Sequence, residues 1–303
     1  MRRKFYTLDV FTEEALSGNP LAVVRDAQGL DAARMQRIAR EFNLSETVFL
    51  FPPRDPVNTA RLRIFTPTRE LPFAGHPTVG AAILIAEMDA PELLAREDLQ
   101  VVLEEEVGDV CCTVRHVKGR APRASFTLPR LPQKAGEASS AAKIAAALGL
   151  DVEDIGFENH EPCLYSAGNP FAFVPLASRD AVARAWPISS AWGEAFGQME
   201  RPAAFLYCRE TVKRAHAFHA RMFAPGLGVT EDPATGSAVA AFAGVIMAFE
   251  PPADGSHGYT IEQGFEMGRP SLITLGLEVE GGVLVEASIG GCAVIVQQGT
   301  IDL

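Results

Sequence analysis

The sequence Arg-Met-Phe-Ala-Pro at 221–225 leads through Glu-Asp-Pro-Ala-Thr-Gly-Ser at 231–237 into an apolar run at 238–249. The same three parts occur earlier, as Arg-Ile-Phe-Thr-Pro at 63–67, Phe-Ala-Gly-His-Pro-Thr at 73–78 and an apolar run at 79–86. With one residue of slack, this alignment places Gly75 on Asp232 and Thr78 on Thr235. A repeat of about half the chain predicts two similar halves, each with a polar turn at a helix start, and one active site between them.

A second pair of segments supports this division. Gly-Asn-Pro followed by four apolar residues occurs at 18–24 and again at 168–174. The stretch 129–140 is rich in Pro, Gly, Ala and Ser and is the best candidate for a linker. We therefore expect an N-terminal lobe at 1–128 and a C-terminal lobe at 129–303, with the C-terminal strand at about 288–303 as a candidate to pack back on the first lobe.

Hydrophobic periodicity predicts many strands and few helices. The predicted strands lie at 4–11, 21–25, 47–51, 60–65, 125–128, 170–174, 203–208 and 214–223, and a hairpin joins 99–106 to 109–117. The predicted helices lie at 31–42 with Asp31 as N-cap, at 77–88, at 141–148 ending at Gly149, and at 233–249. Antiparallel strands with few helices in each half predict an α+β fold, with sheet wrapped around helix.

Composition limits the class of protein. At 303 residues, with 48% apolar and 21% charged, the chain is typical of a soluble protein of two domains. Its net charge of −11 argues against nucleic acid or an anionic membrane as partner, although a local site can still bind a small anion. The longest apolar run is too short to span a bilayer and the N-terminus is no signal peptide, so we expect a cytoplasmic protein.

Several kinds of site are not indicated by the sequence. Five cysteines without a CxxC spacing predict reduced thiols, with Cys111 and Cys112 on opposite faces of a strand. His216 and His219, the one close histidine pair, lie in a predicted strand, where we expect no metal. The sequence contains neither a dinucleotide-binding fingerprint nor a phosphate-binding loop motif.

Two predicted helix starts could bind an anion. Pro77 and Pro233 are predicted at the first helical position, and Asp232 as an N-cap. The free N–H groups of such a first turn attract a carboxylate or a developing oxyanion. The alternative is that the two motifs only cap core helices. Their repetition, with small residues such as Gly75, Gly236 and Ser237 leaving room for a ligand, favours a site.

Glu46 lies between a predicted helix and the apolar strand at 47–51. A carboxyl group at the mouth of a buried strand is partly desolvated, which moves its pKa towards the range useful for proton transfer. The alternative is a solvated glutamate in a loop.

Three segments resemble the signature segments of the PhzF-like phenazine-biosynthesis family: Ser-Glu-Thr at 45–47, Phe-Ala-Gly-His-Pro-Thr at 73–78 and Glu-Asp-Pro-Ala-Thr-Gly-Ser-Ala at 231–238. Further matches lie at 18–20, 263–264, 267–271 and 290–291, so the resemblance covers essentially the whole chain. It implies a diaminopimelate-epimerase-like fold of two pseudo-symmetric lobes, each a barrel-like, mostly antiparallel sheet around a central helix, with the site in the cleft. It also implies a homodimer and no cofactor.

The resemblance implies roles for six residues. Glu46 matches the family's general acid/base, and His76 and Asp232 match its hydrogen-bonding and proton-handling partners. Ser237 matches a substrate-binding residue, while Gly75 and Gly236 line the anion-binding helix starts. In the related epimerases two cysteines occupy the positions of Gly75 and Asp232. This chain has neither thiol, so a two-thiol racemase is not expected.

We therefore expect a cofactor-independent isomerase that moves a proton between carbon atoms of a small carboxylate, with Glu46 as acid/base. The family's founding member isomerises a dihydro-hydroxyanthranilate on the route to phenazines, but a shared fold does not fix the substrate. Two alternatives stay open. One is an epimerase or racemase acting on one carbon of a small acid. The other is a catalytically silent protein that binds a small molecule.

Overall fold

The structure is a computed structural model that describes residues 2–116, 118–227 and 229–303. The chain forms two compact units, one made of Met1–Pro129 with Gly290–Leu303 and the other of Arg130–Ile289. The fold class is α+β, as the sequence predicts, and most strand pairs are antiparallel. Among the described residues, no helix has both the length and the apolar character needed to cross a bilayer.

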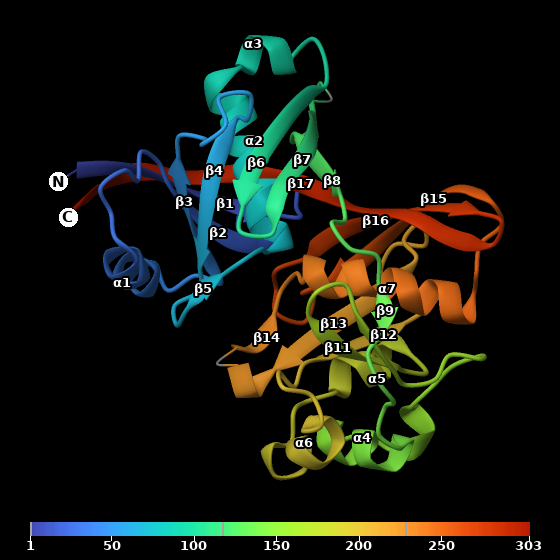
Figure 1. The fold of residues 1–303 in the computed structure, drawn as a ribbon. Helices are drawn as coiled ribbons and strands as arrows, with labels where there is room; N and C mark the ends of the chain where they lie inside the picture. Colours follow the sequence, from blue (N-terminus) through green and yellow to red (C-terminus); the bar gives the residue numbers. More distant parts are fainter. Residues whose placement is uncertain (1, 117, 228) are drawn as a thin grey trace. The chain divides into compact units, whose positions relative to one another are not determined.

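The strands of the first unit close into a barrel (Figure 1). Among the described residues, eight strands pair in the order β1-β2-β3-β4-β6-β7-β8-β17, and β17 pairs back with β1. Closure leaves these strands without an open edge. The elements are β1 (Arg2–Val10), β2 (Asn19–Val24), α1 (Ala32–Phe42), β3 (Glu46–Phe51), β4 (Ala60–Phe65), β5 (Glu70–Leu71), α2 (Gly75–Asp89), α3 (Pro91–Leu94), β6 (Leu99–Glu105), β7 (Gly108–Arg115), β8 (Arg123–Thr127) and the end of β17 (Val283–Asp302).

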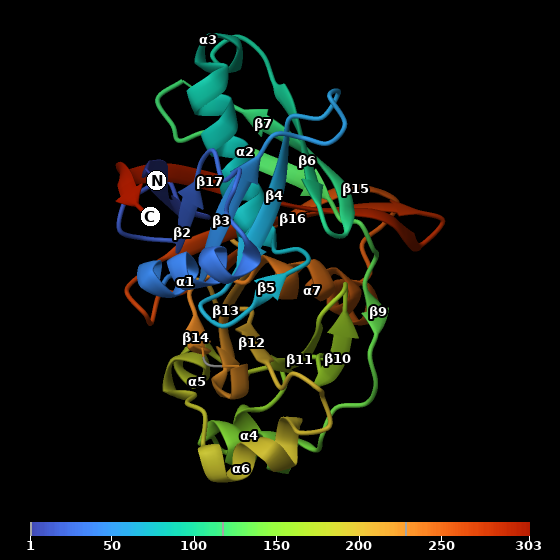
Figure 2. The same ribbon diagram turned by 60° about the vertical axis from the view of Figure 1, so that its left-hand side comes forward.

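Helix α2 fills the inside of this barrel (Figure 2). Residues 75–86 are all buried, and the helix contacts β1, β2, β3, β6, β7 and β8. A helix that is apolar on all sides is expected in such a position. Gly80 permits the close packing, because a Cβ there would lie 2.6 Å from Leu21 Cδ2 and 2.8 Å from Val10 Cγ2.

Helix α1 packs on the face of β3 that points away from α2. This packing shows which face of β3 carries Glu46. Asp31 caps the helix by accepting the N–H of Arg34, as predicted. Met35 packs in one apolar cluster with Phe49 and Phe65. Successive side chains of a strand point to opposite faces. Since Phe49 faces α1, Glu46 faces α2.

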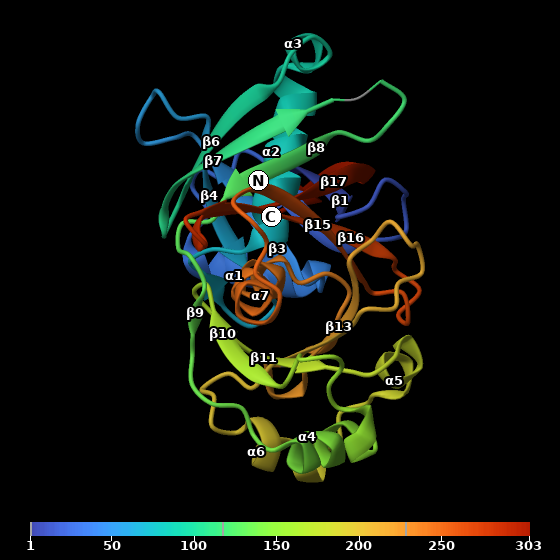
Figure 3. The ribbon, with the colours of Figure 1, turned by 90° about the vertical axis from the view of Figure 1, so that its right-hand side faces the viewer.

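The second unit is built around a similar buried helix, α7, which contacts β9, β10, β11 and β16 (Figure 3). Helices α4 and α6 lie side by side and complete a separate apolar cluster with Phe223 (Figures 1 and 2). The elements are β9 (Gln133–Lys134), α4 (Ala141–Leu148), the 3-10 helix η1 (Val152–Asp154), β10 (Cys163–Ser166), β11 (Pro170–Pro175), α5 (Arg179–Arg184), α6 (Ser189–Phe196), β12 (Ala204–Cys208), β13 (Phe218–Ala224), the 3-10 helix η2 (Pro225–Leu227), β14 (Val229–Asp232), α7 (Gly236–Phe249), β15 (Gly255–Gln263), β16 (Ser271–Glu280) and the start of β17.

The two units repeat one strand arrangement. Strand β4 pairs antiparallel with β5 and parallel with β6, and β13 pairs in the same two ways with β14 and β15. The first residues of the two repeats, Arg63 and Arg221, each form a bidentate ion pair with a glutamate on the short partner strand. The pairs are Arg63 with Glu70, at 2.6 Å from Nε to Oε1, and Arg221 with Glu231, at 2.8 Å.

Strand register corrects the alignment of the helix starts. Phe65 pairs with Glu70 as Phe223 pairs with Glu231, so Leu71 corresponds to Asp232. Each central helix then begins four residues later, at Gly75 and at Gly236. The prediction that Gly75 corresponds to Asp232 is therefore wrong. It arose from matching Pro77 with Pro233 and Thr78 with Thr235, although these residues occupy different places in the two turns.

Some predicted boundaries are also wrong. Pro77 is the third residue of α2 and Pro233 precedes α7, so neither proline is the first helical residue. Thr235, not Asp232, is the N-cap of α7, because Asp232 still pairs with Met222 as the last residue of β14. Strand β13 begins at Phe218 rather than at 214, since the preceding residues form a loop around a buried glutamate. The predicted strand at 109–117 ends at Arg115, and Val117 lies outside the described residues.

Candidate active site

Glu46 and His76 face each other in the first unit. Glu46 is the first residue of β3 and pairs in register with Leu21 of β2. His76 is the second residue of α2. Glu46 Oε2 lies 3.3 Å from His76 Nε2, and the two side chains are 16% and 6% exposed. The alternative of a solvated loop glutamate is therefore wrong.

His76 is neutral at physiological pH. Burial lowers the pKa of its imidazole to about 3. An ionised Glu46 would raise the pKa of His76, but the cost of burying the charged imidazolium is the larger effect at this site. A neutral imidazole nitrogen donates to a carboxylate in one tautomer and accepts from a carboxylic acid in the other. A neutral His76 is therefore compatible with both protonation states of Glu46, whose Oε2 lies 3.3 Å from its Nε2.

Gly75 places backbone N–H groups next to this pair. It is the first residue of α2, and the N-cap, Ala74, makes no side-chain capping bond. In this turn the Thr78 N–H donates a hydrogen bond to the Ala74 carbonyl. The N–H groups of Gly75 and His76 come before it, and such groups have no acceptor within their own helix. They are the candidate donors to an anionic ligand.

Glu105 is a half-buried glutamate at the same helix start, with a buried Oε2 atom, that was not predicted from the sequence. It ends β6, on the α2-facing side with Leu103. Thr78 Oγ1 lies 2.7 Å from Glu105 Oε1 and 2.9 Å from the Ala74 carbonyl oxygen. A hydroxyl has one hydrogen, so a proton on Glu105 is needed to make both contacts hydrogen bonds. Burial raises the pKa of Glu105 to about 8, which agrees with a protonated side chain.

Asp232 is the carboxyl group that the sequence predicts at the helix start of the second unit. It is half-buried at the end of β14. Its Oδ2 accepts a hydrogen bond from Thr235 Oγ1 at 2.6 Å, and its backbone carbonyl accepts from Gln263 Nε2 at 2.7 Å. These bonds fix the short turn that joins β14 to α7.

Gly236 and Ser237 are the first two residues of α7. Gly236 is buried and Ser237 is partly exposed. The register of the repeat makes Ser237 the counterpart of His76. One helix start therefore presents a hydroxyl where the other presents an imidazole.

Each unit holds three of the six residues singled out in the sequence. The structure brings together Glu46, Gly75 and His76 in the first unit and Asp232, Gly236 and Ser237 in the second. The two carboxyl groups are not counterparts. Leu71 takes the place of Asp232, and the pairing of β11 with β12 makes Ala203 the residue in the place of Glu46.

Comparison with known proteins identifies the family. Residues 8–299 match the family model described as phenazine biosynthesis-like protein. The chain belongs to the phenazine biosynthesis-like protein family. An uncharacterized isomerase of Mesorhizobium japonicum is 51% identical to this member, over 99% of this chain and 98% of the relative. The trans-2,3-dihydro-3-hydroxyanthranilate isomerase of Pseudomonas fluorescens is 34% identical, over 99% of each protein.

A solved structure supports the same assignment. The phenazine biosynthesis protein of the PhzF family from Bacillus anthracis is 26% identical, with a TM-score of 0.89 and coverage of 100% of both chains. These matches confirm the resemblance and the fold class inferred from the sequence. This member of the phenazine biosynthesis-like family is an isomerase.

The predicted absence of disulfides agrees with this family member's structure. All five cysteines are free thiols, and Cys111 is exposed while Cys112 is buried, as expected for neighbours in a strand. Within the described ranges, no cluster of three or more His, Cys, Asp and Glu side chains is placed to hold a metal ion.

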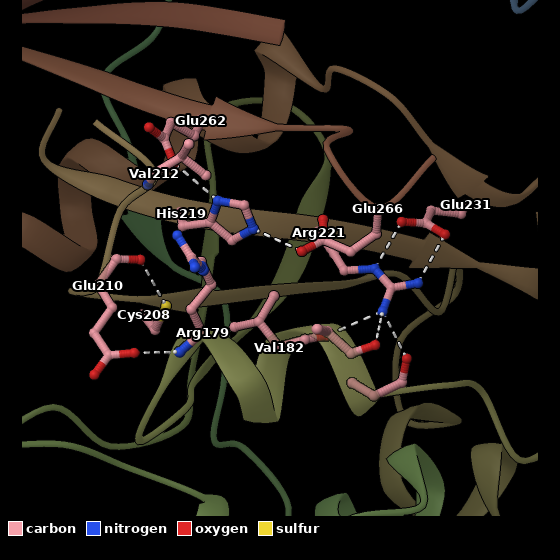
Figure 4. A network of polar contacts seen from close by, with 12 residues as sticks. Arg179, Val182, Cys208, Glu210, Val212, His219, Arg221, Glu231, Glu262 and Glu266 are labelled. Atoms are coloured by element: carbon pink, nitrogen blue, oxygen red, sulfur yellow. Dashed lines mark hydrogen bonds and ion pairs between the residues drawn. The ribbon is translucent and has the colours of Figure 1, made fainter. Parts of the chain in front are cut away.

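His219 belongs to a buried ion-pair network instead (Figure 4). His216 contacts the same network through Glu262. The Nδ1 atoms of both rings contact the Glu262 carboxylate, at 2.7 and 2.9 Å. His219 Nε2 lies 2.8 Å from Glu266 Oε1. Burial opposes a charge on His219, but the two carboxylates outweigh it and raise its pKa. The network joins β13 to β15 and holds the loop before β13.

Proposed function

We propose that this protein is a cofactor-independent isomerase in which Glu46 moves a proton between two carbon atoms of a small carboxylate substrate. The 3.3 Å contact between Glu46 Oε2 and His76 Nε2, in surroundings that exclude most water, carries the proposal. The name of the Pseudomonas fluorescens relative supports it, since that enzyme isomerises trans-2,3-dihydro-3-hydroxyanthranilate.

The proposed reaction needs one acid/base group. The Glu46 carboxylate takes a proton from carbon, and the electron pair of the broken C–H bond enters the π system of the substrate. The Glu46 carboxylic acid then delivers the proton to the far end of the shifted double bond. Substrate and product have the same composition, so no oxidant or reductant is consumed. Neutral His76, whose Nε2 lies 3.3 Å from Glu46 Oε2, pairs with Glu46 during the reaction. A positioned acid/base group such as Glu46 contributes about 10²- to 10⁴-fold.

The helix starts supply the proposed binding groups. N–H groups at the start of a helix stabilise a carboxylate and the negative charge that develops during proton removal. We propose that Gly75, Gly236 and the Ser237 hydroxyl are substrate-binding groups. Asp232 assists in proton handling. We also propose a homodimer, which light scattering on the purified protein tests. A monomer mass would contradict that part alone.

The decisive experiment compares wild type with Glu46→Gln on trans-2,3-dihydro-3-hydroxyanthranilate and on a panel of small cyclic and linear carboxylates in deuterated water. Glu46→Gln should lower turnover about 100-fold or more while the unfolding temperature stays unchanged. Glu41→Gln, at an exposed position of α1, is the control and should keep full activity. Near-wild-type turnover by Glu46→Gln would show that another group is the base.

The position of deuterium in the product identifies the reaction. A shifted double bond with deuterium at a new carbon supports the isomerase. Inversion at a single deuterated carbon would instead indicate an epimerase, and a bound ligand recovered without exchange would indicate a binding protein. His76→Ala and Asp232→Ala should each weaken both binding and rate, and normal kinetics in both would contradict the assigned site.

A further inference from the structure

We propose that Gln263 and Thr235 are positioning residues that fix the orientation of the Asp232 carboxylate. The proposal rests on the function proposed for Asp232 above. It concerns how that carboxylate is held, which is a separate question from what it does.

Asp232 lies beside a gap between two strands that pair with the same edge of β13. Along one edge of β13, Met222 pairs with Asp232 of β14 and Ala220 pairs with Gln263 of β15. Strand β14 runs antiparallel to β13 and β15 runs parallel to it, so their C-terminal ends point at each other. The side chain of Gln263 crosses the gap between the two ends.

The side-chain amide of Gln263 has hydrogen-bond partners that allow only one orientation. It is fully buried. Its Nε2 donates to the Asp232 carbonyl at 2.7 Å and to Thr235 Oγ1 at 3.0 Å, and its Oε1 accepts the Thr235 N–H at 2.9 Å. The opposite orientation would set two oxygens against each other at Asp232 and two N–H groups against each other at Thr235. The partners therefore fix which way the amide points.

This orientation sets the direction of the Thr235 hydroxyl. Because Thr235 Oγ1 accepts from Gln263, its own hydrogen points to Asp232 Oδ2 at 2.6 Å. Hydrogen bonds to an ionised carboxylate are short and about twice as strong as those between neutral groups. The chain from Gln263 through Thr235 therefore holds the Oδ2 atom of the Asp232 carboxylate.

The backbone after Gln263 closes on the same turn. Gly264 has φ +78°, and a Cβ there would lie 2.5 Å from the Pro233 carbonyl oxygen and from the Arg269 carbonyl oxygen. Any other residue would push β15 away from the turn that carries Asp232. Glycine is needed here both for its conformation and for the close approach.

The first unit supplies an independent comparison. The counterparts of Asp232 and Thr235 are Leu71 and Ala74, so the hydroxyl is present in the turn that carries a carboxylate and absent from the turn that does not. If the threonine served only as the N-cap of the central helix, the same role would exist at Ala74 in the first unit. Thr235, whose side chain makes no capping bond to its own helix, serves Asp232.

Thr235→Val and Thr235→Ser test the proposal, because valine keeps the shape without the hydroxyl and serine restores it. In ¹³C-labelled protein, with Asp232→Asn assigning the signal, the side-chain carboxyl resonance of Asp232 should move in Thr235→Val and return in Thr235→Ser. On trans-2,3-dihydro-3-hydroxyanthranilate, kcat should fall about 10- to 100-fold in Thr235→Val with KM changed less than about threefold, and Thr235→Ser should recover. Ser271→Ala removes another buried hydroxyl of this unit, bonded to the Arg269 carbonyl, and should change neither readout.

The two readouts separate this proposal from the proposed function. An Asp232 resonance that stays in place in Thr235→Val, or one that Ser271→Ala moves equally, overturns the positioning role whatever the activity. Wild-type kcat in Thr235→Val also overturns it, provided that Asp232→Asn lowers turnover. If Asp232→Asn keeps full turnover while the resonance responds to Thr235, the function proposed for Asp232 fails and the positioning contact stands.

Discussion

Glu105 and Gln263 occupy the same position in the two units of this protein. Arg61 pairs with Glu104 as His219 pairs with Glu262, and Glu105 and Gln263 are the next residues. The correspondence includes the loops that these strands hold. The Glu104 carboxylate accepts the N–H groups of Arg54 and Asp55, and the Glu262 carboxylate accepts those of Val212 and Lys213. A carboxyl group in one unit thus takes the place of an amide in the other.

A protonated glutamate has nearly the shape of glutamine and is likewise uncharged. Burial raises the pKa of Glu105 to about 8, so at neutral pH both positions carry a neutral side chain. Each of them lies beside the start of its central helix, Glu105 against Thr78 and Gln263 against Thr235. The difference between them appears only when Glu105 loses its proton.

We therefore expect Glu105→Gln to stabilise the protein, increasingly so as pH rises. The carboxyl pKa is about 4.5 before folding and about 8 after it, so the folded state binds more protons between these values. Stability then falls as pH rises through this window, and glutamine removes that dependence. Urea unfolding at pH 5, 7 and 9 should show a small difference at pH 5 and a gain of about 1 kcal/mol or more at pH 9.

Glu104→Gln is the matched control for this experiment. Hydrogen bonds from the N–H groups of Arg54 and Asp55 lower the pKa of Glu104, so its charged form is the one that the fold uses. That variant should lose stability at neutral pH. A pH-independent effect in Glu105→Gln would mean that Glu105 is not protonated in the folded protein. A gain in Glu104→Gln would mean that the fold does not use the charge of Glu104.

The reciprocal change, Gln263→Glu, should have the opposite pH dependence. A protonated glutamate offers one O–H donor where Gln263 uses two N–H groups, and an ionised one offers none. We expect a loss of about 1–3 kcal/mol at low pH, because a buried acceptor is left without its donor. The loss should grow above the ordinary carboxyl range. A constant loss from pH 5 to 9 would contradict the proposed pairing of the two positions.

Local signals allowed part of this fold to be predicted. Asp31 caps α1, Gly149 ends α4 in a left-handed conformation with φ 66°, and β4 has the predicted bounds. These features depend on residues adjacent in sequence, so their chemistry is readable without a structure. The repeat was readable for the same reason, since the arginine at 63 and the one at 221 begin similar five-residue segments.

Features that depend on distant partners were not readable. Asp232 was predicted to cap α7, but its pairing with Met222 keeps it in β14, and the bond from Gln263 holds it there. Glu105 lies in a run of three glutamates at 104–106, which reads as a charged surface. Strand alternation from Leu103 was the one available signal that Glu105 points inward.

His219 should stabilise the protein only while its imidazole carries a charge. Both ring nitrogens face carboxylates, Glu262 and Glu266, and the pKa of His219 is raised above its ordinary value of 6.5. The stabilisation is therefore complete below about pH 6.5 and is lost as pH rises through the higher folded-state pKa. In His219→Gln, the loss of unfolding free energy relative to wild type should be largest near pH 6 and smaller near pH 9.

His257→Gln is a suitable control for that titration, because His257 Nε2 contacts the Ala253 carbonyl, which has no charge to pair with an imidazolium. This variant shows what the loss of a histidine without a carboxylate partner costs at each pH. If His219→Gln instead loses more stability at pH 9 than at pH 6, the bonds around Glu262 do not depend on a charged imidazole.

Arg63 and Arg221 occupy the same position in the two units. They test how burial changes the contribution of an arginine–glutamate ion pair to stability. Arg221 bonds Glu231 through Nε and Nη2, and its Nη1 donates to the carbonyl groups of Val182, Ala183 and Ala185. Its side chain is 4% exposed, against 27% for Arg63 in the pair with Glu70.

Lysine keeps the charge of arginine, but it cannot form two parallel bonds to a carboxylate and reach the carbonyl groups at the same time. Arg221→Lys should cost about 2–4 kcal/mol of unfolding free energy, since it leaves buried acceptors unpaired, whereas Arg63→Lys should cost about 1 kcal/mol or less. Equal losses in urea unfolding would mean that the carbonyl contacts of Arg221 add nothing to the ion pair that both units share.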